Sequence, residues 1–463
     1  MRPNRYFGDR RFYRTALSVA LPIMIQNGIT NFVGMLDNIM VGRVGTSEMT
    51  GVSIANTLLF VFNLAIFGAV SGAGIFGAQF YGRGDVEGVR HAFRFKIMEC
   101  AAILALGIGV YLCFGRPLME LYLRGEGNVT NIAESLRCGQ SYLRIMLLGL
   151  PAFAVAMCYA GTLREAGQTV VPMTAGLAAV GVNFVCNWLL IFGKLGLPKL
   201  DADGAAIATV ISRYVEAAIV VIWTHRHPKK APYFVGVWRS LRIPRRLAGE
   251  IARRGAPLIL NETLWALGQA LLLQCYSIRS YEVVSATNIA FTLGNVCNVA
   301  FMAMGASIGI LVGQLLGAGK TEEAKDTDRK LIVFTELTCL VFGGVMAAVS
   351  GVFPHIYNTE AEIRALASRF ILINAALMPI HAYTNAAYFT LRSGGKTFVT
   401  FLFDSVFSCV VVAPVAYVLS RFTTLPIVWL FLCCQSLELI KGVVGFGMIR
   451  SGVWIQNIVK EEY

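Results

Sequence analysis

The chain has 463 residues, of which 56% are hydrophobic and only 14% are charged, and its mean hydropathy is +0.63. A soluble globular domain is about 45–50% apolar and about 25% charged, so this composition excludes a soluble protein and predicts an integral membrane protein. The net charge of +13 does not indicate nucleic acid binding, because the basic residues follow membrane topology instead.

Apolar runs divide the chain into twelve expected membrane helices, each long enough to cross the hydrocarbon of a bilayer. Their approximate ranges are 15–38, 50–79, 92–114, 136–162, 168–193, 204–224, 252–276, 285–313, 328–352, 364–391, 397–420 and 426–449. Lys and Arg are far more frequent in the loops on the side of the termini than in the opposite loops. The positive-inside rule therefore predicts a multi-pass protein of the cytoplasmic (inner) membrane with both termini in the cytoplasm.

The first apolar run contains a carboxylate, Asp37. Inserting an Asp at this depth costs on the order of 2.5–3.5 kcal/mol, so its presence indicates a task, a cap on the following loop being the alternative. Asn27, Thr30 and Asn31 fall at helical spacings and predict a polar face that looks inward. Pro22 lies inside the run and permits a bend. The run therefore predicts a coupling helix.

The second half of the chain repeats the first at a shift of 235 residues. Pro22 aligns with Pro257, and the segment GAQFYGRG is echoed by VGQLLGAG. A second pair, TLREAGQT and TLRSGGKT, aligns at a shift of 228. The chain therefore predicts an all-α integral membrane protein with twelve transmembrane helices in two pseudo-symmetric six-helix lobes, 1–224 and 252–463, which start on the same face because six is even.

The segment between the lobes, 225–251, is basic and carries the aromatic residues Tyr233, Phe234 and Trp238. We expect a cytoplasmic linker that lies along the lipid headgroups, with its Lys and Arg near anionic lipid and its rings at the interface. A solvated tether is the alternative.

Two further patterns predict helix packing. Glycines recur every four residues from position 305 to position 317, the spacing that lets membrane helices approach closely. Opposite charges at Arg213 with Glu216, and at Glu438 with Lys441, predict ion pairs inside the membrane.

Polar residues in the fifth and sixth expected spans are candidate cation ligands. Asn183 and Asn187 lie one helical turn apart, and Thr209 lies in the next span. Together with Asp37 they offer hard oxygen donors suited to Na⁺, or to H⁺ through protonation of the carboxylate. For the asparagine pair, hydrogen bonding between helices is the alternative.

The second half offers a set of residues for substrate or for a second cation. They are Glu262, Trp265, Gln269, His381, Asn385 and Asp404. Glu262 and Asp404 are acids inside apolar runs, and Trp265 offers an aromatic face to a planar cation.

The sequence has no HExxH motif and no Walker loop, and the cysteines show no metal-ligand spacing. We therefore expect no catalytic residue, no enzyme activity and no cofactor. Without an ATP site, transport energy must come from an ion gradient.

These motifs resemble the MATE (multidrug and toxic compound extrusion) family over essentially the whole chain. The resemblance rests on MLDNIMVGRVGT after a Pro-containing helix, the two repeated pairs, and the Asn183/Asn187 segment with FGKLGLP and AAIAT. It implies twelve helices in two lobes and export of organic cations in exchange for Na⁺ or H⁺. It carries the first-helix Asp of the family onto Asp37, the fifth-helix polar pair onto Asn183 and Asn187, and the sixth-helix Thr onto Thr209.

The sequence also departs from the family pattern. One branch has an Asp where this chain has Asn187. The NorM-like branch has a seventh-helix acid slightly deeper than Glu262, where Trp265 stands here, and its tenth-helix Asp falls near His381. We therefore expect the cation site in the first lobe, with Asp37, Asn183 and Asn187 as Na⁺ ligands if the coupling ion is Na⁺.

The expected function is secondary active antiport: multidrug efflux of small organic, often cationic, compounds by a monomer embedded in membrane lipids. A flippase for a lipid-linked saccharide of the same superfamily is the first alternative, although such proteins tend to have a cavity rich in Arg and Lys. A non-transporting membrane enzyme or receptor is the second.

Overall fold

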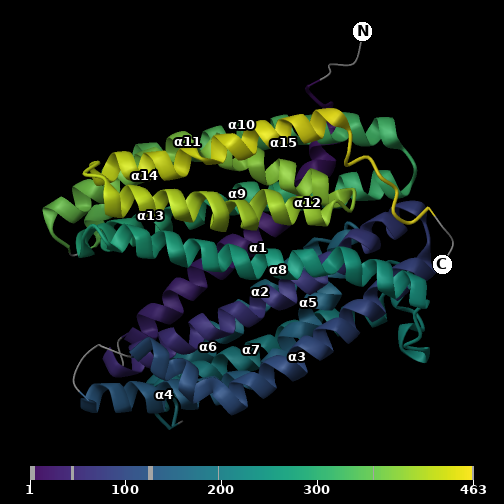
Figure 1. Ribbon diagram of the computed structural model, residues 1–463. Coiled ribbons are helices and arrows are strands. Elements are labelled where there is room, and N and C mark those ends of the chain that lie inside the picture. Colours follow the sequence, from purple (N-terminus) through teal and green to yellow (C-terminus); the bar gives the residue numbers. More distant parts are fainter. Residues whose placement is uncertain (1–5, 43–45, 124–128, 197, 358, 461–463) are drawn as a thin grey trace. The chain divides into compact units, whose positions relative to one another are not determined.

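The computed structural model describes residues 6–42, 46–123, 129–196, 198–357 and 359–460, except for the side chains of 33–39, 41–42, 46–47, 121–123, 129–131 and 281. All regular structure within these ranges is helical (Figure 1). This follows from the long apolar runs, because a chain in lipid must satisfy its backbone hydrogen bonds within each segment.

The first half of the chain forms seven helices within the described ranges, and the second half continues from α8. The first seven are α1 (Arg10–Gly42), α2 (Thr46–Arg83), α3 (Val86–Leu123), α4 (Val129–Leu147), α5 (Leu150–Glu165), α6 (Val170–Phe192) and α7 (Asp201–Arg226). The short turns η1 (Pro232–Phe234) and η2 (Val237–Arg239) follow. The second half contains α8 (Arg245–Ser277), α9 (Tyr281–Gly317), α10 (Thr321–Val349), the turn η3 (Phe353–Ile356), α11 (Ala361–Ser393), α12 (Thr397–Phe401), the π-helical turns η4 (Leu402–Val406) and η5 (Ser408–Val412), α13 (Ala413–Phe422), α14 (Ile427–Ser436) and α15 (Glu438–Ser451).

The expected membrane spans appear as long helices. Among the described residues, ten helical segments are long and apolar enough to cross a membrane, and α4 with α5 makes an eleventh, bent by 47°. The bend falls where Pro151, near the start of α5, cannot donate a backbone hydrogen bond to the preceding turn. The first expected span is α1, which is 33 residues long but is not among these segments. The all-α membrane fold is confirmed.

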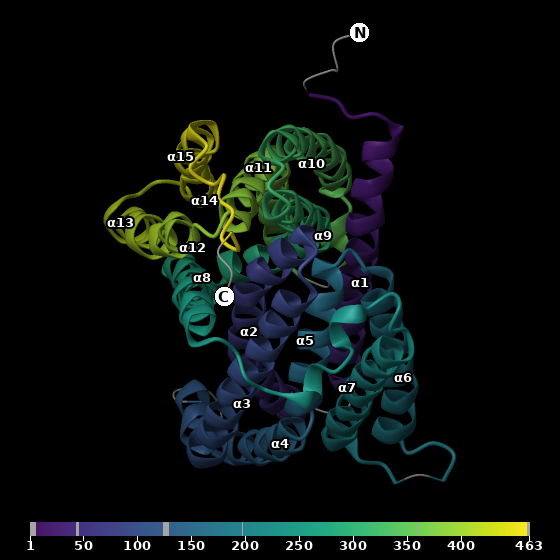
Figure 2. The same ribbon diagram turned by 90° about the vertical axis from the view of Figure 1, so that its right-hand side faces the viewer.

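The chain divides into two compact units. Unit 1 comprises residues up to Met24, the segment Ala78–Asp85 and the chain from Ala252 onward, and unit 2 comprises Ile25–Gly77 and Val86–Ile251. In unit 1, α9, α10 and α11 pack side by side (Figure 2). In unit 2, α6 packs on α7, and α3 packs on α4 and α5.

The repeated motifs end their helices in the same way. Gly84 and Gly319, which align at the shift of 235, have φ values of 80° and 74°, and Gly167 and Gly395 have φ values of 77° and 76°. An L side chain rarely adopts this left-handed conformation, which explains why glycine stands at all four positions. The internal repeat is therefore also a repeat of backbone geometry.

The glycines spaced four apart on α9 serve close packing, as the sequence predicts. In unit 1, a Cβ placed on Gly305 would lie 2.4 Å from Oδ1 of Asn385 on α11. Where the end of α2 crosses α9, a Cβ on Gly82 would lie 1.9 Å from the carbonyl oxygen of Gln314, and one on Gly317 would lie 1.9 Å from that of Gln79. Gly82 and Gly317 thus let the backbones of α2 and α9 come into contact at this crossing.

Replacing Gly317 by alanine is expected to destabilise unit 1 by about 1–3 kcal/mol, because the added methyl group meets a backbone oxygen that cannot rotate away. Gly294, on the same helix, has no atom within 4 Å of its ideal Cβ position, so Gly294→Ala is the matched control and should cost nothing. Thermal unfolding of both purified variants measures the difference. Equal midpoints would contradict the close crossing.

The linker differs from its expected position. Tyr233 and Phe234 are 2% and 1% exposed, and Phe234 stacks on Tyr159 of α5 with ring centroids 4.8 Å apart. Arg94 of α3 donates from Nε to the carbonyl oxygen of Val237 at 3.0 Å. The expectation that these two rings anchor in the lipid interface is therefore wrong, because both rings are buried within unit 2. Of the three aromatic residues, only Trp238 remains half exposed.

Candidate ion and substrate sites

The helices α6 and α7 bring three of the predicted oxygen donors together in unit 2. Asn187 donates from Nδ2 to Oδ1 of Asn183 at 3.1 Å, and Asn183 donates from Nδ2 to the hydroxyl of Thr209 at 3.3 Å. Both asparagines are buried, at 5% and 1% exposure. The contact between Asn183 and Thr209 joins α6 to α7, as the structural interpretation expects, whereas the contact between the two asparagines lies within α6. Together they gather the oxygen atoms that a cation site requires.

The fourth predicted ligand, Asp37, falls near the end of α1, and its side chain lies outside the described residues. Of the predicted polar face, Asn27 is half-buried, but Thr30 and Asn31 are exposed, so these residues do not form a buried face in the described part of the helix. Oε1 of Gln26, which is 9% exposed, accepts a hydrogen bond from Nη2 of Arg164 on α5 at 2.7 Å. Gln26 thus makes a buried polar contact on α1, eleven residues before Asp37.

A buried ion pair in unit 2 was not anticipated. Lys96, which falls within the expected span 92–114, lies inside α3 with 0% exposure and contacts both carboxylate oxygens of Glu165 at 2.6 Å. It also donates to the hydroxyl of Thr162 at 3.0 Å. A buried ammonium needs such partners because desolvation otherwise costs several kcal/mol. The charge of Lys96 is therefore neutralised within the protein.

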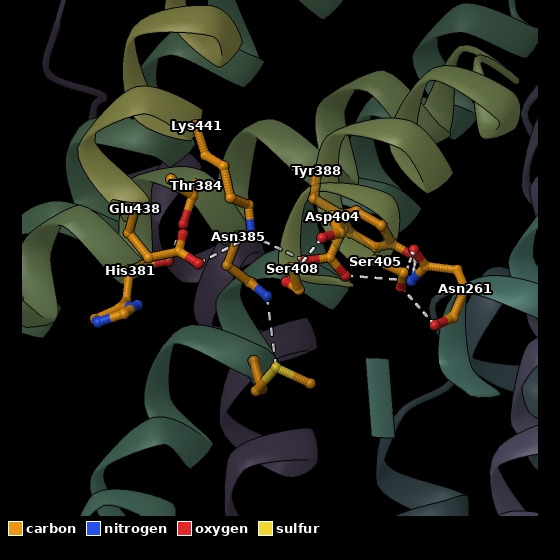
Figure 3. Close-up of polar contacts among 11 residues, drawn as sticks. Asn261, His381, Thr384, Asn385, Tyr388, Asp404, Ser405, Ser408, Glu438 and Lys441 are labelled. Carbon is orange, nitrogen blue, oxygen red and sulfur yellow. Dashed lines mark hydrogen bonds and ion pairs between the residues drawn. The ribbon is translucent and has the colours of Figure 1, made fainter. Parts of the chain in front are cut away.

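In unit 1, Asp404 is the centre of a polar network (Figure 3). Its Oδ1 accepts from Nζ of Lys441 on α15 at 2.9 Å, and its Oδ2 accepts from Nδ2 of Asn261 on α8 at 3.3 Å. Lys441 also contacts Oε1 of Glu438 at 3.0 Å. Asp404 lies in the π-helical turn Leu402–Val406, a distortion that often accompanies functional sites.

The network continues through hydroxyl groups. Ser405 donates both to the carbonyl oxygen of Asn261, at 2.6 Å, and to its Oδ1, at 2.7 Å. Asn261 also donates from Nδ2 to the hydroxyl of Tyr388 on α11 at 3.4 Å. These three residues were missed by the sequence analysis, and the only local signal was that Asn261 directly precedes Glu262 and Ser405 directly follows Asp404.

The two ion pairs predicted from helical spacing are confirmed. Arg213 contacts Glu216 at 3.1 Å, and Lys441 contacts Glu438 at 3.0 Å. The ion pair between Asp404 and Lys441 was not predicted, because Asp404 lies in η4 and Lys441 lies on α15. One lysine thus lies between two carboxylates, so a cation that binds Asp404 would compete with Lys441.

The remaining predicted residues of the second half do not join this network. Glu262 and Gln269 are half-buried on α8 and make no side-chain hydrogen bond or ion pair within the described part of the chain, and Trp265 is 37% exposed. Asn385 donates from Nδ2 to the sulfur of Met302 at 3.5 Å, and the imidazole of His381 extends away from Asp404 (Figure 3). Only Asp404 of the predicted second set is held by charged partners.

The sequence profile of the MatE family matches the chain twice, over residues 22–189 and 257–418. The chain belongs to the MatE family. Each match begins at one of the two aligned prolines, Pro22 and Pro257, so the internal repeat coincides with two copies of the family unit. Members of this family are membrane transporters, so the chain is a transporter and not an enzyme.

The relatives of this MATE transporter include proteins named for drug resistance. The probable multidrug resistance protein NorM of Thermotoga maritima is 25% identical over 452 residues, covering 96% of this chain and 93% of the relative. The multidrug resistance protein MdtK of Edwardsiella ictaluri is 23% identical, covering 78% of each chain.

Solved structures share the fold of this MATE chain. A mutant of a MATE transporter from Vibrio cholerae superposes with a TM-score of 0.86 at 18% identity, covering 96% of this chain and 98% of that one. A transporter from Pyrococcus furiosus of the wider MOP superfamily superposes with a TM-score of 0.84 at 17% identity and covers 96% of each chain. Its binding pocket is described as reversed in polarity, which suggests a different function for that protein.

Proposed function

We propose that this MATE chain is a secondary active antiporter of the cytoplasmic (inner) membrane that exports small organic, often cationic, compounds in exchange for Na⁺ or H⁺. The observation that carries the proposal is the family match in both halves, together with relatives named as multidrug resistance proteins. The distribution of Lys and Arg supports termini in the cytoplasm.

The proposed coupling site is Asp37 with Asn183, Asn187 and Thr209. Asn183, Asn187 and Thr209 are hydrogen-bonded to one another, so a cation would meet several oxygens at a small cost in side-chain entropy. The mechanism we propose is that ion binding changes the charge of Asp37 and thereby biases the two lobes, 1–224 and 252–463, between inward-open and outward-open forms.

Glu262, Trp265 and Gln269 on α8, with His381 and Asn385 on α11, are the proposed substrate contacts of the second lobe. Trp265 is partly exposed, and the side chains of Glu262 and Gln269 make no hydrogen bond or ion pair within the described residues. They are therefore available to a ligand, whereas the carboxylate of Asp404 is engaged by Lys441.

The flippase alternative requires unpaired cations for a diphosphate. Lys96 and Lys441 are buried cations, but each is neutralised by carboxylates in the described structure. That pairing favours an antiporter for organic compounds.

The test is transport in proteoliposomes containing the purified chain. A jump in external Na⁺ or in pH is expected to drive efflux of a fluorescent organic cation above the rate of protein-free vesicles. An ion-independent movement of a fluorescent lipid-linked sugar diphosphate, with no efflux of the cation, would replace the proposal by the flippase function.

A further inference from the structure

The chain after α15 folds back into unit 1. Residues 452–460, which we name the tail strap, contain no regular helix. Within the strap, the side chains of Trp454 and Val459 are only 2% and 0% exposed, and Ile458 is also buried. The last residues of a domain are poorly ordered unless other parts of the fold tie them down. The burial of the tail strap therefore requires partners that hold it.

The first partner is Gln79, near the end of α2, whose side chain is fully buried. Its Nε2 donates to the carbonyl oxygen of Gln456 at 3.1 Å, and its Oε1 accepts from the backbone N–H of Ile458 at 2.9 Å. Nε2 also donates to the carbonyl oxygen of Ser393, at the end of α11, at 2.9 Å. One amide side chain thus binds the backbone of the strap through both its donor and its acceptor.

The tail strap also binds the end of α9. Asn457 donates from Nδ2 to the carbonyl oxygen of Gly317 at 3.2 Å, and its Oδ1 accepts from the backbone N–H of Val459 at 3.1 Å. Arg83, the last residue of α2, donates from Nη1 to the carbonyl oxygen of Val459. The strap is therefore bonded to the ends of α2 and α9 at the same time.

The helix ends that the strap holds are the two that cross at Gly82 and Gly317. These glycines align at the shift of 235, as do Gln79 and Gln314, and each glycine meets the carbonyl oxygen of the glutamine on the other helix. Such a reciprocal contact is expected where a two-fold axis passes through a crossing. When two related halves rock against each other, equivalent helices that meet on their axis have to separate on one side of the membrane.

The contacts of the strap are suited to reversible release. Val453 is 42% exposed and Lys460 is also exposed, so water reaches both ends of the strap. Hydrogen bonds beside an exposed chain end open more easily than those inside a packed helix. The strap can therefore leave the crossing without unfolding of α2 or α9.

We propose that the tail strap is a latch that holds the crossing of α2 and α9 closed and is released when the two halves open on this side. The distribution of Lys and Arg assigns this side to the cytoplasm, so the latched form is closed to substrates from the cytoplasm. The role in transport rests on the proposed antiport, because only a protein that alternates between two forms uses a latch.

The first measurement is hydrogen–deuterium exchange of the full-length protein in lipid nanodiscs, read on the tail strap and on the ends of α2 and α9. The test variant is Q79M, since methionine keeps the length of the side chain but removes every hydrogen bond of the amide. The matched control is Q456M, because the side chain of Gln456 makes no hydrogen bond with the described residues and its carbonyl oxygen stays in place. Exchange in Q79M is expected to be about tenfold faster at all three places, and exchange in Q456M should equal that of the wild type.

The second measurement is ion-driven uptake of a fluorescent organic cation into inside-out membrane vesicles, whose outer face is the cytoplasmic one. A cation from this face enters only the unlatched form, so its apparent affinity rises with the fraction of that form. The KM of Q79M is therefore expected to fall by up to about tenfold, while the KM of Q456M stays at the wild-type value. A strap with a purely structural role would lower the amount of folded protein and leave the KM unchanged.

Equal exchange in Q79M and Q456M overturns the latch, and so does faster exchange of the tail strap without faster exchange at the ends of α2 and α9. An unchanged KM in Q79M also overturns it. If the wild type shows no ion-driven uptake, the proposed function fails, and the exchange of the three segments alone decides whether the strap holds the crossing. If Q79M does not fold, Asn457→Ala removes the bond to Gly317 and gives the same comparison.

Discussion

Replacing Lys441 by methionine is expected to destabilise unit 1 by about 3–5 kcal/mol, because it leaves two carboxylates in a buried site without their cation. The side chain of Lys441 is 7% exposed, and those of Asp404 and Glu438 are 21% and 18% exposed. Methionine retains the length of the side chain, so the change removes charge more than volume. Denaturant unfolding in detergent measures the free energy.

The same substitution at an exposed pair is the control. Lys325 pairs with Glu322 on α10, and their side chains are 40% and 83% exposed, so Lys325→Met should cost about 1 kcal/mol or less. A triple variant, Lys441→Met with Asp404→Asn and Glu438→Gln, should recover most of the lost stability, since no unpaired charge remains. The buried triad would be refuted if Lys441→Met and Lys325→Met cost the same.

Replacing Asp37 by asparagine is expected to abolish ion-driven export while the protein still binds its organic substrate. Asparagine has nearly the same shape but carries no charge and cannot be protonated, so neither Na⁺ nor H⁺ can alter the energy of α1 through it. The measurement is efflux of a fluorescent cation from proteoliposomes after a Na⁺ or pH jump, with substrate binding measured separately to show that the variant is folded.

Asp9→Asn is the matched control for this change. Oδ1 of Asp9 accepts from the backbone N–H of Phe12 at 2.7 Å, just before α1 begins, and asparagine caps a helix as well as aspartate does. Asp9→Asn should therefore transport normally. Coupled export that persists in Asp37→Asn would remove this residue from the mechanism.

The features predicted well from the sequence are those that depend on near neighbours. Hydropathy identified the membrane segments, because each helix satisfies its own backbone in lipid. The pairs Arg213 with Glu216 and Glu438 with Lys441 followed from spacing, since helix geometry places residues three apart on one face. The aligned glycines also depend on near neighbours. A left-handed turn is formed by consecutive residues and favours glycine, so the same short motif appears in both halves of the chain.

The errors concern partners far apart in the chain. Phe234 was placed in the lipid interface because aromatic rings beside basic residues favour that position, but it packs on Tyr159. Lys96 falls within the expected span 92–114, but its partner was not predicted, because Glu165 comes from another helix. For both residues, the partner lies far away in the chain, so the local sequence pattern could not show the contact.

The sequence by itself determined that this protein is a helical membrane transporter built from two related halves, because apolar length, repeated turns and family motifs are all written in consecutive residues. Only the tertiary structure decided which charges are paired: Asp404 meets Asn261 and Lys441. These contacts join residues of separate helices, and the energy of a buried charge is set by the groups around it in space, whatever their distance along the chain.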